Sequence, residues 1–216
     1  MIIVYYSYIN GSSFSVASLG KYGFPQSYLK RLLRFRNDRD ALLSIHGRLL
    51  LKNILNNEFH FQLDFESIVY NRFGKPFINK TNFDFSISHA SGVVVCAVSD
   101  EGLVGVDLER VDEVILADYR DQMTDFEWTT VVSSPASDAF FNYWTQKESV
   151  LKAAGTGLST DLKSFEIISG KTVVDDSKWF VLPIELRAGY VCHLAGNSDF
   201  DSETLTLREV GFNDYF

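Results

Sequence analysis

The stretch FDFSISHASGVVVCAVSDEGLVGVDLER, residues 83–110, decides the fold of this chain. It contains three short runs rich in valine, isoleucine and phenylalanine, at 83–88, 93–99 and 104–109, separated by glycine, serine and aspartate. Runs of this length and composition are typical of β-strands, because branched and aromatic side chains pack well on a pleated surface. The stretch therefore predicts three consecutive strands.

Two longer segments flanking these strands are predicted to be helical. Apolar residues recur at helical spacing from 29 to about 55, which favours one long helix or two abutting helices. After a helix-start region at 133–137, a second long helix is expected at 140–154, where Gly155 and Gly157 would end it. Further strands are expected at 1–9, 165–169, 179–187, 190–195 and 204–210.

The two parts of the chain resemble each other weakly. FSISHASG (85–92) aligns without gaps with LPIELRAG (182–189), and each leads into a strand that contains valine and cysteine. Two unrelated hairpins explain this match nearly as well, but helices and hairpins follow the same order in both parts. We therefore predict an α+β fold of two similar halves, 1–102 and 103–216, related by a pseudo-two-fold axis. Each half would pack a long helix on a small, mostly antiparallel sheet, with the functional cleft between the halves.

Length and composition limit the class of protein. Of the 216 residues, 46% are hydrophobic and 22% charged, which suits a folded core and is unlike a disordered chain. The longest apolar runs, 1–6 and 93–98, are far shorter than the roughly 20 residues of a membrane helix. The chain shows no pattern of a secretory signal, and Cys96 and Cys192 lie in apolar strand-like runs, as reduced core thiols do. We expect a cytoplasmic protein without a membrane partner.

Charge is distributed unevenly along the chain. The net charge is −8, yet residues 21–52 carry eight lysines and arginines against Asp38 and Asp40, a local balance of +6. Such a segment indicates either a local anion-binding site or a solvated helix face, and charge alone does not choose between them. The acidic total argues against non-specific binding of nucleic acid.

Carboxylates form the first candidate site. Alternation along the strand at 104–109 places Asp107 and Glu109 on one face, where such pairs are usually just solvated. Glu148 lies on the core-facing stripe of the predicted helix, where an unpaired carboxylate is costly. An i, i+4 pair with Lys152 would compensate it. If the helix instead packs with Glu148 over Asp107 and Glu109, the three carboxylates would suit Mg²⁺.

Three further residues are suited to phosphate oxygens. Lys75 in a Gly-Lys-Pro turn supplies an ammonium group, and Ser88 and His89 at a strand end supply a hydroxyl and an imidazole. A satisfied turn histidine is the ordinary alternative for His89. The chain contains no GxGxxG or GxxxxGK[ST] phosphate loop and no GxSxG elbow, so dinucleotide-binding, P-loop and α/β-hydrolase interpretations lose their main support.

Four ordered motifs together resemble one family. They are GKP (74–76), FSISH (85–89), VGVDLE (104–109), and WTQKE (144–148) followed by Lys152 and GTGL (155–158). In this order and spacing the chain is similar to the 4′-phosphopantetheinyl transferases, specifically the two-halved surfactin-synthetase-activating type. Ser86 and Ser149 depart from the asparagine and alanine common in that family, and neither change removes an expected ligand.

The resemblance implies transfer of the 4′-phosphopantetheine arm from coenzyme A to a serine of an apo acyl or peptidyl carrier protein. The reaction would depend on Mg²⁺, release adenosine 3′,5′-bisphosphate, and serve fatty acid, polyketide or nonribosomal peptide biosynthesis. A monomer would suffice, with Mg²⁺ held by Asp107, Glu109 and Glu148. Glu148, or a metal-bound water that it orients, would take the serine proton, and Lys152 would stabilise the developing charge. Coenzyme A would be bound by Lys75, Ser88, His89, Arg31, Arg36 and Arg39, with Lys30 and Arg34 as alternatives in the basic segment.

The resemblance also implies that the carrier docks near residues 111–126, through apolar contacts because this segment is acidic. Two rival functions share parts of the pattern. One is a non-catalytic module that binds coenzyme A or a carrier, and the other is a Mg²⁺-dependent phosphohydrolase that needs no carrier. The presence of all three carboxylates and of Lys152 argues against the non-catalytic module.

Overall fold

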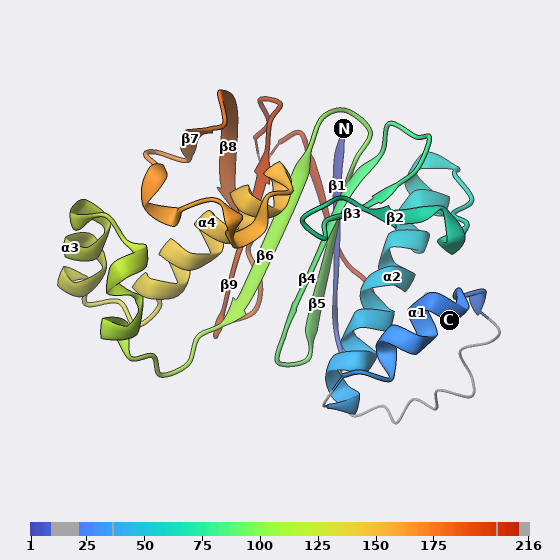
Figure 1. Ribbon diagram of the computed structural model, residues 1–216, viewed down its shortest axis with the longest axis horizontal. Coiled ribbons are helices and arrows are strands. Elements are labelled where there is room, and N and C mark those ends of the chain that lie inside the picture. The colour runs from blue at the N-terminus through green and yellow to red at the C-terminus, as the bar shows by residue number, and fades with distance from the viewer. Residues whose placement is uncertain (10–21, 36, 202, 212–216) are drawn as a thin grey trace.

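The computed structural model describes residues 1–9, 22–35, 37–201 and 203–211, which form an α+β fold with two four-stranded sheets (Figure 1). The first sheet has the strand order β10-β1-β5-β4. Its strands are β1 (Ile2–Tyr8), β4 (Asp84–Ala90), β5 (Val93–Ser99) and β10 (Leu205–Glu209). β5 pairs antiparallel with both β1 and β4, whereas β10 runs parallel to β1.

The second sheet is antiparallel throughout its described pairs, in the order β6-β9-β8-β7. Its strands are β6 (Val104–Arg110), β7 (Lys171–Val174), β8 (Ser177–Pro183) and β9 (Tyr190–Gly196). A small two-stranded sheet of β2 (Ile68–Tyr70) and β3 (Pro76–Ile78) lies beside the first.

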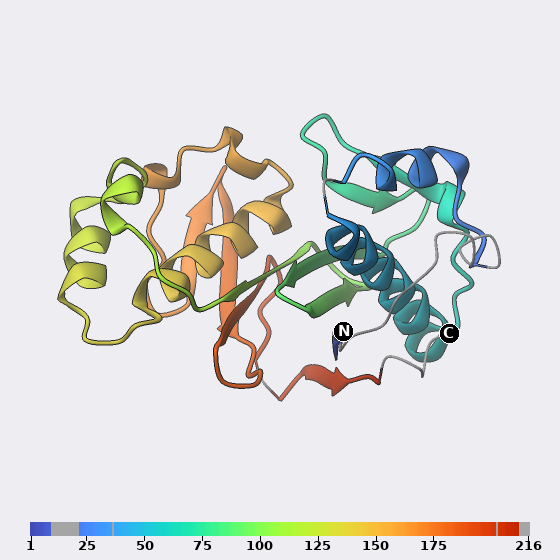
Figure 2. The same cartoon turned by 90° about the horizontal axis from the view of Figure 1, so that it is seen from below.

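One long helix packs on each large sheet, as Figure 2 shows. The helices are α1 (Gln26–Leu32), α2 (Asp38–Phe59), α3 (Asp125–Ser133) and α4 (Ala139–Ala154), and the short 3₁₀ turns are η2 (Phe65–Ser67), η3 (Leu116–Gln122), η4 (Gly157–Ser159) and η5 (Leu162–Ser164). The Asn37 side chain caps the start of α2, and α4 ends at Ala154, followed by Gly155, whose φ of 72° favours glycine. α2 packs on the first sheet, whereas α4 contacts β6 and β9 of the second.

Most of the predicted elements are confirmed. The three strands of residues 83–110 form β4, β5 and β6, the segment 29–55 forms two helices, and the helix predicted at 140–154 is α4. The strand predicted at 165–169 is wrong, because Ser169 and Gly170 both have positive φ and turn the chain. The region 133–137 proved to link two helices, since α3, which was not predicted, ends at Ser133.

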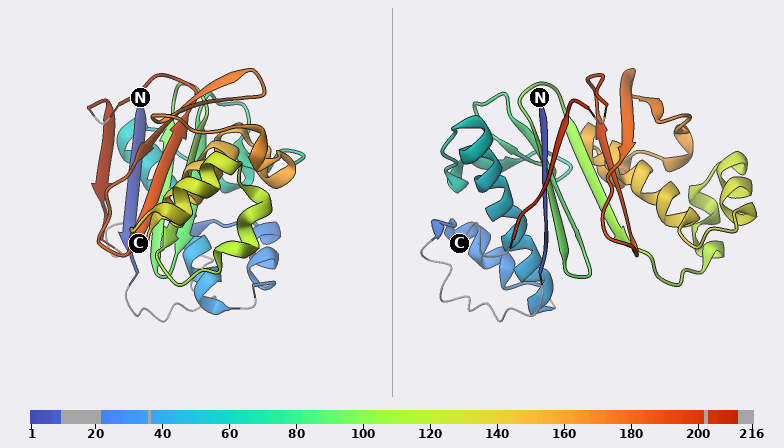
Figure 3. Two further views of the ribbon diagram at one scale, coloured as in Figure 1. Left: turned by 90° about the vertical axis from the view of Figure 1, so that its left-hand side faces the viewer. Right: turned by 180° about the vertical axis from the view of Figure 1, so that it is seen from behind.

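The C-terminal strand β10 follows the strands of the second sheet in the chain but belongs to the first sheet. The predicted boundary at 102/103 falls in the turn between β5 and β6, yet β10 follows β9 in the chain and pairs with β1, from Ile2 opposite Leu205 to Tyr6 opposite Glu209. Figure 3 shows β10 beside β1, away from the strands that precede it. The first sheet is therefore completed by a segment from beyond the boundary, and its parallel pair makes it mixed.

Between the sheets lies a core of small apolar side chains. Val93, Val95 and Ala97 of β5 and Val104 and Val106 of β6 share one buried cluster. This confirms the predicted alternation along 104–109, since the other face of β6 is left for Gly105, Asp107 and Glu109. The two cysteines are free and buried, as expected of core thiols. None of the helices in the described ranges is long and apolar enough to cross a membrane.

Candidate active site

Two edge strands, β4 of the first sheet and β6 of the second, lie side by side. Side chains of β4 accept hydrogen bonds from the backbone of β6 at every second residue. The bonds run from Val104 N to Asp84 Oδ2 (2.8 Å), from Val106 N to Ser86 Oγ (3.0 Å) and from Leu108 N to Ser88 Oγ (3.3 Å). We call this ladder the β4–β6 seam. It gives the backbone N–H groups at the edge of β6 their hydrogen-bond acceptors, and it fixes the register between the two sheets.

Helix α4 packs on the face of β6 that carries Gly105, Asp107 and Glu109, opposite the apolar core between the sheets. A Cβ atom at Gly105 would lie 2.1 Å from the Ser149 carbonyl oxygen and 2.3 Å from the Ala153 backbone nitrogen. These are backbone atoms of the helix, so only glycine allows this approach. The close contact places Glu148 and Lys152 over the face of β6 that carries the two strand carboxylates.

Asp107 is the most enclosed of these carboxylates, with 4% of its surface exposed. Its Oδ1 accepts hydrogen bonds from Lys152 Nζ at 2.6 Å and from Ser88 Oγ at 3.1 Å. Its Oδ2 is buried and has no hydrogen-bond partner among the described residues. A buried carboxylate oxygen without a partner is costly, which indicates that the site is built to receive a ligand there.

Glu109 and Glu148 share the electrostatic environment of Asp107. Burial, followed by repulsion from Asp107 and, more weakly, from Glu148, raises the pKa of Glu109 to about 7 against the opposing charge of Lys152. Burial and the Asp107 charge also raise the pKa of Glu148. A cation would relieve this repulsion, and carboxylate oxygens are the ligands that Mg²⁺ prefers.

The three carboxylates do not form a ready-made metal cluster. Within the described ranges, no group of three or more His, Cys, Asp or Glu side chains is close enough to hold an ion. Lys152 binds Asp107 across the two elements. The donor types and the unpartnered Asp107 oxygen nevertheless fit a divalent cation, so the residues present are compatible with one.

A cavity of about 340 Å³ opens beside these groups, between the two halves. Its lining includes Gly74, Pro76 and Ser86 from the first half and Glu148 and Lys152 from α4. The cavity therefore gives a substrate access to Glu148 and Lys152.

Comparison with known proteins identifies the family. Residues 22–101 match a model described as 4′-phosphopantetheinyl transferase, N-terminal, and residues 103–194 match the 4′-phosphopantetheinyl transferase superfamily. The chain is 33% identical over 171 residues to the 4′-phosphopantetheinyl transferase gsp of Aneurinibacillus migulanus, covering 74% of this chain and 70% of that protein. The chain belongs to the 4′-phosphopantetheinyl transferase superfamily.

Other relatives carry related names. The 4′-phosphopantetheinyl transferase Sfp of Bacillus subtilis is 27% identical over 186 residues, which cover 79% of this chain and 81% of Sfp. The L-aminoadipate-semialdehyde dehydrogenase-phosphopantetheinyl transferase of Xenopus laevis is 30% identical over 156 residues, covering 63% of this chain and 51% of that protein. This chain is thus an enzyme of the transferase class, of the Sfp type.

The Lys75 ammonium of this transferase is bound at Asp84, outside the group formed by Asp107, Glu109 and Glu148. It binds Asp84 Oδ2 at 2.6 Å and the carbonyl oxygens of Ala153 at 3.0 Å and Val104 at 3.4 Å. Burial lowers the pKa of Lys75 and raises that of Asp84, and in each case the charge of the partner opposes the change. The sequence analysis missed Asp84, although its position between two phenylalanines, in step with Ser86 and Ser88, was a signal that it faces the seam.

The Ser88 hydroxyl is also engaged within the protein. It donates to Asp107 Oδ1 and accepts from Leu108 N and Lys152 Nζ, which uses its one proton and both lone pairs. His89, on the opposite face of β4, is half-buried. Burial and the Lys152 charge lower its pKa, while Asp40 at the start of α2 raises it. His89 thus lies within electrostatic reach of both Lys152 and the basic segment.

The arginines predicted to bind coenzyme A lie in or near α1 and α2. Arg31 is exposed, with its guanidinium 5.3 Å from the centre of the Tyr70 ring. Arg39 is exposed in the first turn of α2, and its guanidinium lies close to Gly92 in the β4–β5 turn. Arg36 lies outside the described residues. The structure brings Arg39 and the end of β4 together and leaves Arg31 beside β2.

Lys147, in the helical motif, has a structural role. It is 1% exposed, pairs with Glu127 of α3 at 2.6 Å and donates to the Leu162 carbonyl at 2.8 Å. Glu127 also completes a capping box with Thr124 at the start of α3. The pair therefore anchors α3 to α4, on the far side of the helix from the seam.

Proposed function

We propose that this transferase moves the 4′-phosphopantetheine arm of coenzyme A to a serine hydroxyl of an apo carrier protein, in a Mg²⁺-dependent reaction that releases adenosine 3′,5′-bisphosphate. The observation that carries the proposal is the arrangement of α4 on β6, with Glu148 and Lys152 facing Asp107 and lining the cavity between the halves. The names of the relatives support the transferred group.

The reaction exchanges a phosphoanhydride bond of coenzyme A for a phosphoester bond to the carrier. The serine oxygen of the carrier forms a bond to the β-phosphorus of coenzyme A, and the bond from that phosphorus to the bridging oxygen breaks. The serine loses its proton, and adenosine 3′,5′-bisphosphate leaves with the electron pair. The protein must therefore accept a proton and neutralise the charge that develops on the phosphates.

Glu148 is suited to accept the serine proton. It is only partly enclosed and lines the cavity, so a substrate hydroxyl can reach it. Burial and Asp107 raise its pKa, which makes it a stronger base than an ordinary surface glutamate. Lys152 lines the same cavity and keeps 31% of its side chain exposed, so its ammonium can donate to a phosphate oxygen.

Asp107, Glu109 and Glu148 are the residues that would hold Mg²⁺. When bound, the ion would supply Lewis-acid neutralisation of the pyrophosphate. Asp107 can offer a second oxygen without releasing Lys152, because its Oδ2 is unpartnered among the described residues. His89 and the exposed Arg31 and Arg39 would bind the nucleotide phosphates.

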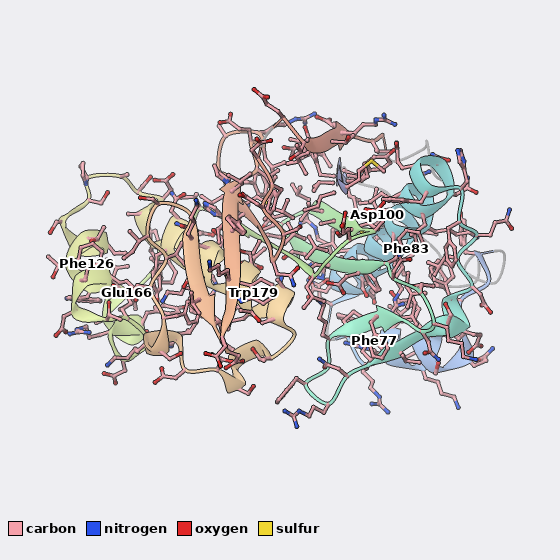
Figure 4. All side chains as sticks on the ribbon, turned by 90° about the horizontal axis from the view of Figure 1, so that it is seen from above. Phe77, Phe83, Asp100, Phe126, Glu166 and Trp179 are labelled. Carbon is pink, nitrogen blue, oxygen red and sulfur yellow. The ribbon has the colours of Figure 1, made fainter. Side chains whose placement is uncertain are left out.

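The carrier would dock on the segment 111–126. Ile115 and Phe126 are 70% and 64% exposed, whereas Val114 and Leu116 pack partly against the core behind them. Figure 4 shows Phe126 at one end of the molecule, far from Phe77 of the first half. Exposed apolar side chains on an acidic segment suit apolar contact with an acidic carrier. We further infer that the halves are related by a pseudo-two-fold axis. We also infer that a monomer suffices, because one chain supplies both walls of the cavity.

The deciding experiment incubates the protein with coenzyme A, Mg²⁺ and an apo carrier protein and then measures the mass of the carrier. We expect the carrier to gain the mass of the phosphopantetheine arm, and Ile115→Asp to slow labelling more than Asp118→Asn, an exposed change in the same segment. Consumption of coenzyme A without labelling would indicate a phosphohydrolase. Binding of coenzyme A with neither labelling nor consumption would indicate a non-catalytic module.

A further inference from the structure

We propose that Lys75 and Asp84 are positioning residues that hold α4 against β6, and that Lys75 is not a ligand of coenzyme A. This inference rests on the proposed function for its kinetic consequences. It concerns the register between two elements that carry the reacting groups, since α4 carries Glu148 and Lys152 and β6 carries Asp107.

The contacts of the Lys75 ammonium carry the proposal. Its three acceptors belong to three elements: Asp84 at the start of β4, Val104 at the start of β6 and Ala153 in the last turn of α4. An ammonium group has three protons, so these contacts use its full capacity. Carbonyl oxygens in the last turn of a helix lack intrahelical partners and attract a positive charge. One side chain therefore ties a helix end to the two strands of the seam.

The loop that carries Lys75 adds a second tie to the same helix end. Asn71 Nδ2 donates to the Gly155 carbonyl oxygen at 2.8 Å, and Asn71 Oδ1 accepts from the backbone nitrogens of Phe73 and Lys75. The backbone nitrogen of Asn71 also donates to the carbonyl oxygen of Lys75 at 2.9 Å. The first half thus supplies the C-terminal cap of the catalytic helix in the second half, from a loop that its own hydrogen bonds hold in shape.

The position of Lys75 between two cavities explains why its charge does not face the substrate. It lines the cavity of about 340 Å³ together with Glu148, and also a cavity of about 410 Å³ on the other side, together with Asp84 and Ala153. Its ammonium binds Asp84 and Ala153, which line the second cavity and not the first. With side-chain exposures of 13% and 10%, Lys75 and Asp84 form a buried pair, and drawing Lys75 away would leave Asp84 buried without its charge partner.

The test compares Lys75→Met, Asp84→Asn, their combination and Lys75→Arg in the full chain, with coenzyme A and an apo carrier as substrates. A positioning role predicts that Lys75→Met and Asp84→Asn each lower kcat by about tenfold to a hundredfold while KM for coenzyme A changes by less than about twofold. The double variant should be no worse than the poorer single variant, because the two residues act through one contact. Lys75→Arg should recover part of kcat.

Glu209→Gln is the matched control. Glu209 of β10 in the first sheet pairs at 2.7 Å with Arg187, which lies between β8 and β9 of the second sheet, and both side chains of this pair are exposed, unlike those of Lys75 and Asp84. It should keep the kcat and KM of the natural sequence. A rise in KM of about tenfold or more for Lys75→Met, with Asp84→Asn unaffected, would make Lys75 a substrate ligand and overturn the proposal. Unchanged kcat and KM in the folded fraction of both variants would overturn it as well.

Amide hydrogen exchange separates this proposal from the proposed function. If the natural sequence labels no carrier, the proposed function has failed, and exchange in the last turn of α4 still tests the positioning role. Asp84→Asn should then raise exchange at residues 152–155 and leave the first turns of α4 unchanged. Equal protection of that turn in Asp84→Asn and the natural sequence would refute the role of the pair.

Discussion

At each end of the β4–β6 seam a lysine binds an aspartate at 2.6 Å, but the two pairs have different surroundings. Around Lys75 and Asp84 the Lys75 protons meet three oxygens, and Asp84 Oδ2 also accepts from a backbone nitrogen. Around Lys152 and Asp107, one aspartate oxygen has no partner among the described residues, and Lys152 is 31% exposed.

The difference teaches how one pair of side-chain types can serve two purposes. A saturated pair resists change, because every movement breaks a hydrogen bond in a buried setting. The Lys152–Asp107 pair is unsaturated, because one carboxylate oxygen accepts no hydrogen bond from the described residues. Next to two further carboxylates, a bound cation would supply that contact and reduce the repulsion. The first pair is therefore suited to hold the elements in place, and the second is suited to take part in chemistry.

The strongest way to break the unsaturated end is Glu148→Gln. It removes the proposed base but keeps the size of the side chain, so labelling of the carrier should fall by about 10²–10⁴-fold. Calorimetric binding of coenzyme A should persist, and Asp138→Asn at the N-cap of the same helix, which also removes one negative charge, is the control for an altered helix charge. Full activity of Glu148→Gln would remove Glu148 from the mechanism.

Both ends of the seam depend on the close approach of α4 to β6, which Gly105→Ala should disrupt. The new methyl group would meet helix backbone at 2.1 Å, so the free energy of unfolding should fall by about 3 kcal/mol. Gly47→Ala is the matched control in α2, because its methyl would meet the Ile87 side chain, which can shift. Chemical denaturation of both variants makes the comparison. Equal losses would mean that the contact at Gly105 is no tighter than an ordinary one.

Acid should weaken both halves together, because each buries a neutral imidazole. Burial lowers the pKa of His46 in α2 and of His193 in β9 from 6.5 to about 4. As the pH falls below 6.5, the unfolded chain takes up these protons before the folded chain does, so stability is full above pH 6.5 and declines towards pH 4. Each histidine should contribute up to about 3 kcal/mol to this decline.

Denaturant melts between pH 7.5 and 4 provide the measurement for this decline. His46→Gln should make the dependence on pH shallower, whereas His60→Gln, at an exposed position, should leave it unchanged. An identical slope for His46→Gln and the natural sequence would contradict a buried neutral His46.

A paired comparison along the seam itself sharpens the contrast between its ends. Ser86→Ala and Ser88→Ala each remove one acceptor for a β6 amide, but only Ser88 also touches Asp107 and Lys152. Ser88→Ala should lower carrier labelling by about tenfold to a hundredfold, as loss of a residue that orients a ligand does. Ser86→Ala should cost about 1 kcal/mol of stability and leave labelling within about twofold. Equal activities would mean that Ser88 only supports the strand.

The sequence predicts the chemistry of the unsaturated end better than the structure of the saturated one. Alternation along 104–109 places Asp107 and Glu109 on one face, and helical spacing places Glu148 on the core-facing stripe, because both are local periodicities. Whether that helix packs over the strand pair was left open by the sequence. The partner of Lys75 follows from no such period, since Asp84, Val104 and Ala153 meet only once both sheets are assembled. Lys75 was therefore interpreted as a phosphate donor, while the structure shows its protons already used.

The pairing of β10 with β1 could not be predicted from the sequence for a similar reason. The strand at 204–210 was predicted, but its parallel partner β1 lies at the other end of the chain, and no short-range pattern encodes that choice. Helix α3 was missed because its polar start resembles a loop until the capping box of Thr124 and Glu127 is recognised.

The return of β10 to the first sheet bears on how the polypeptide could be divided. A break in the turn before β6 would give a leading fragment whose β1 edge lacks its neighbour, and a trailing fragment carrying an orphan strand. Each fragment would hold a surface that only the other can cover. Split in this way, the enzyme would behave as a complementation pair, active when the two pieces are brought together.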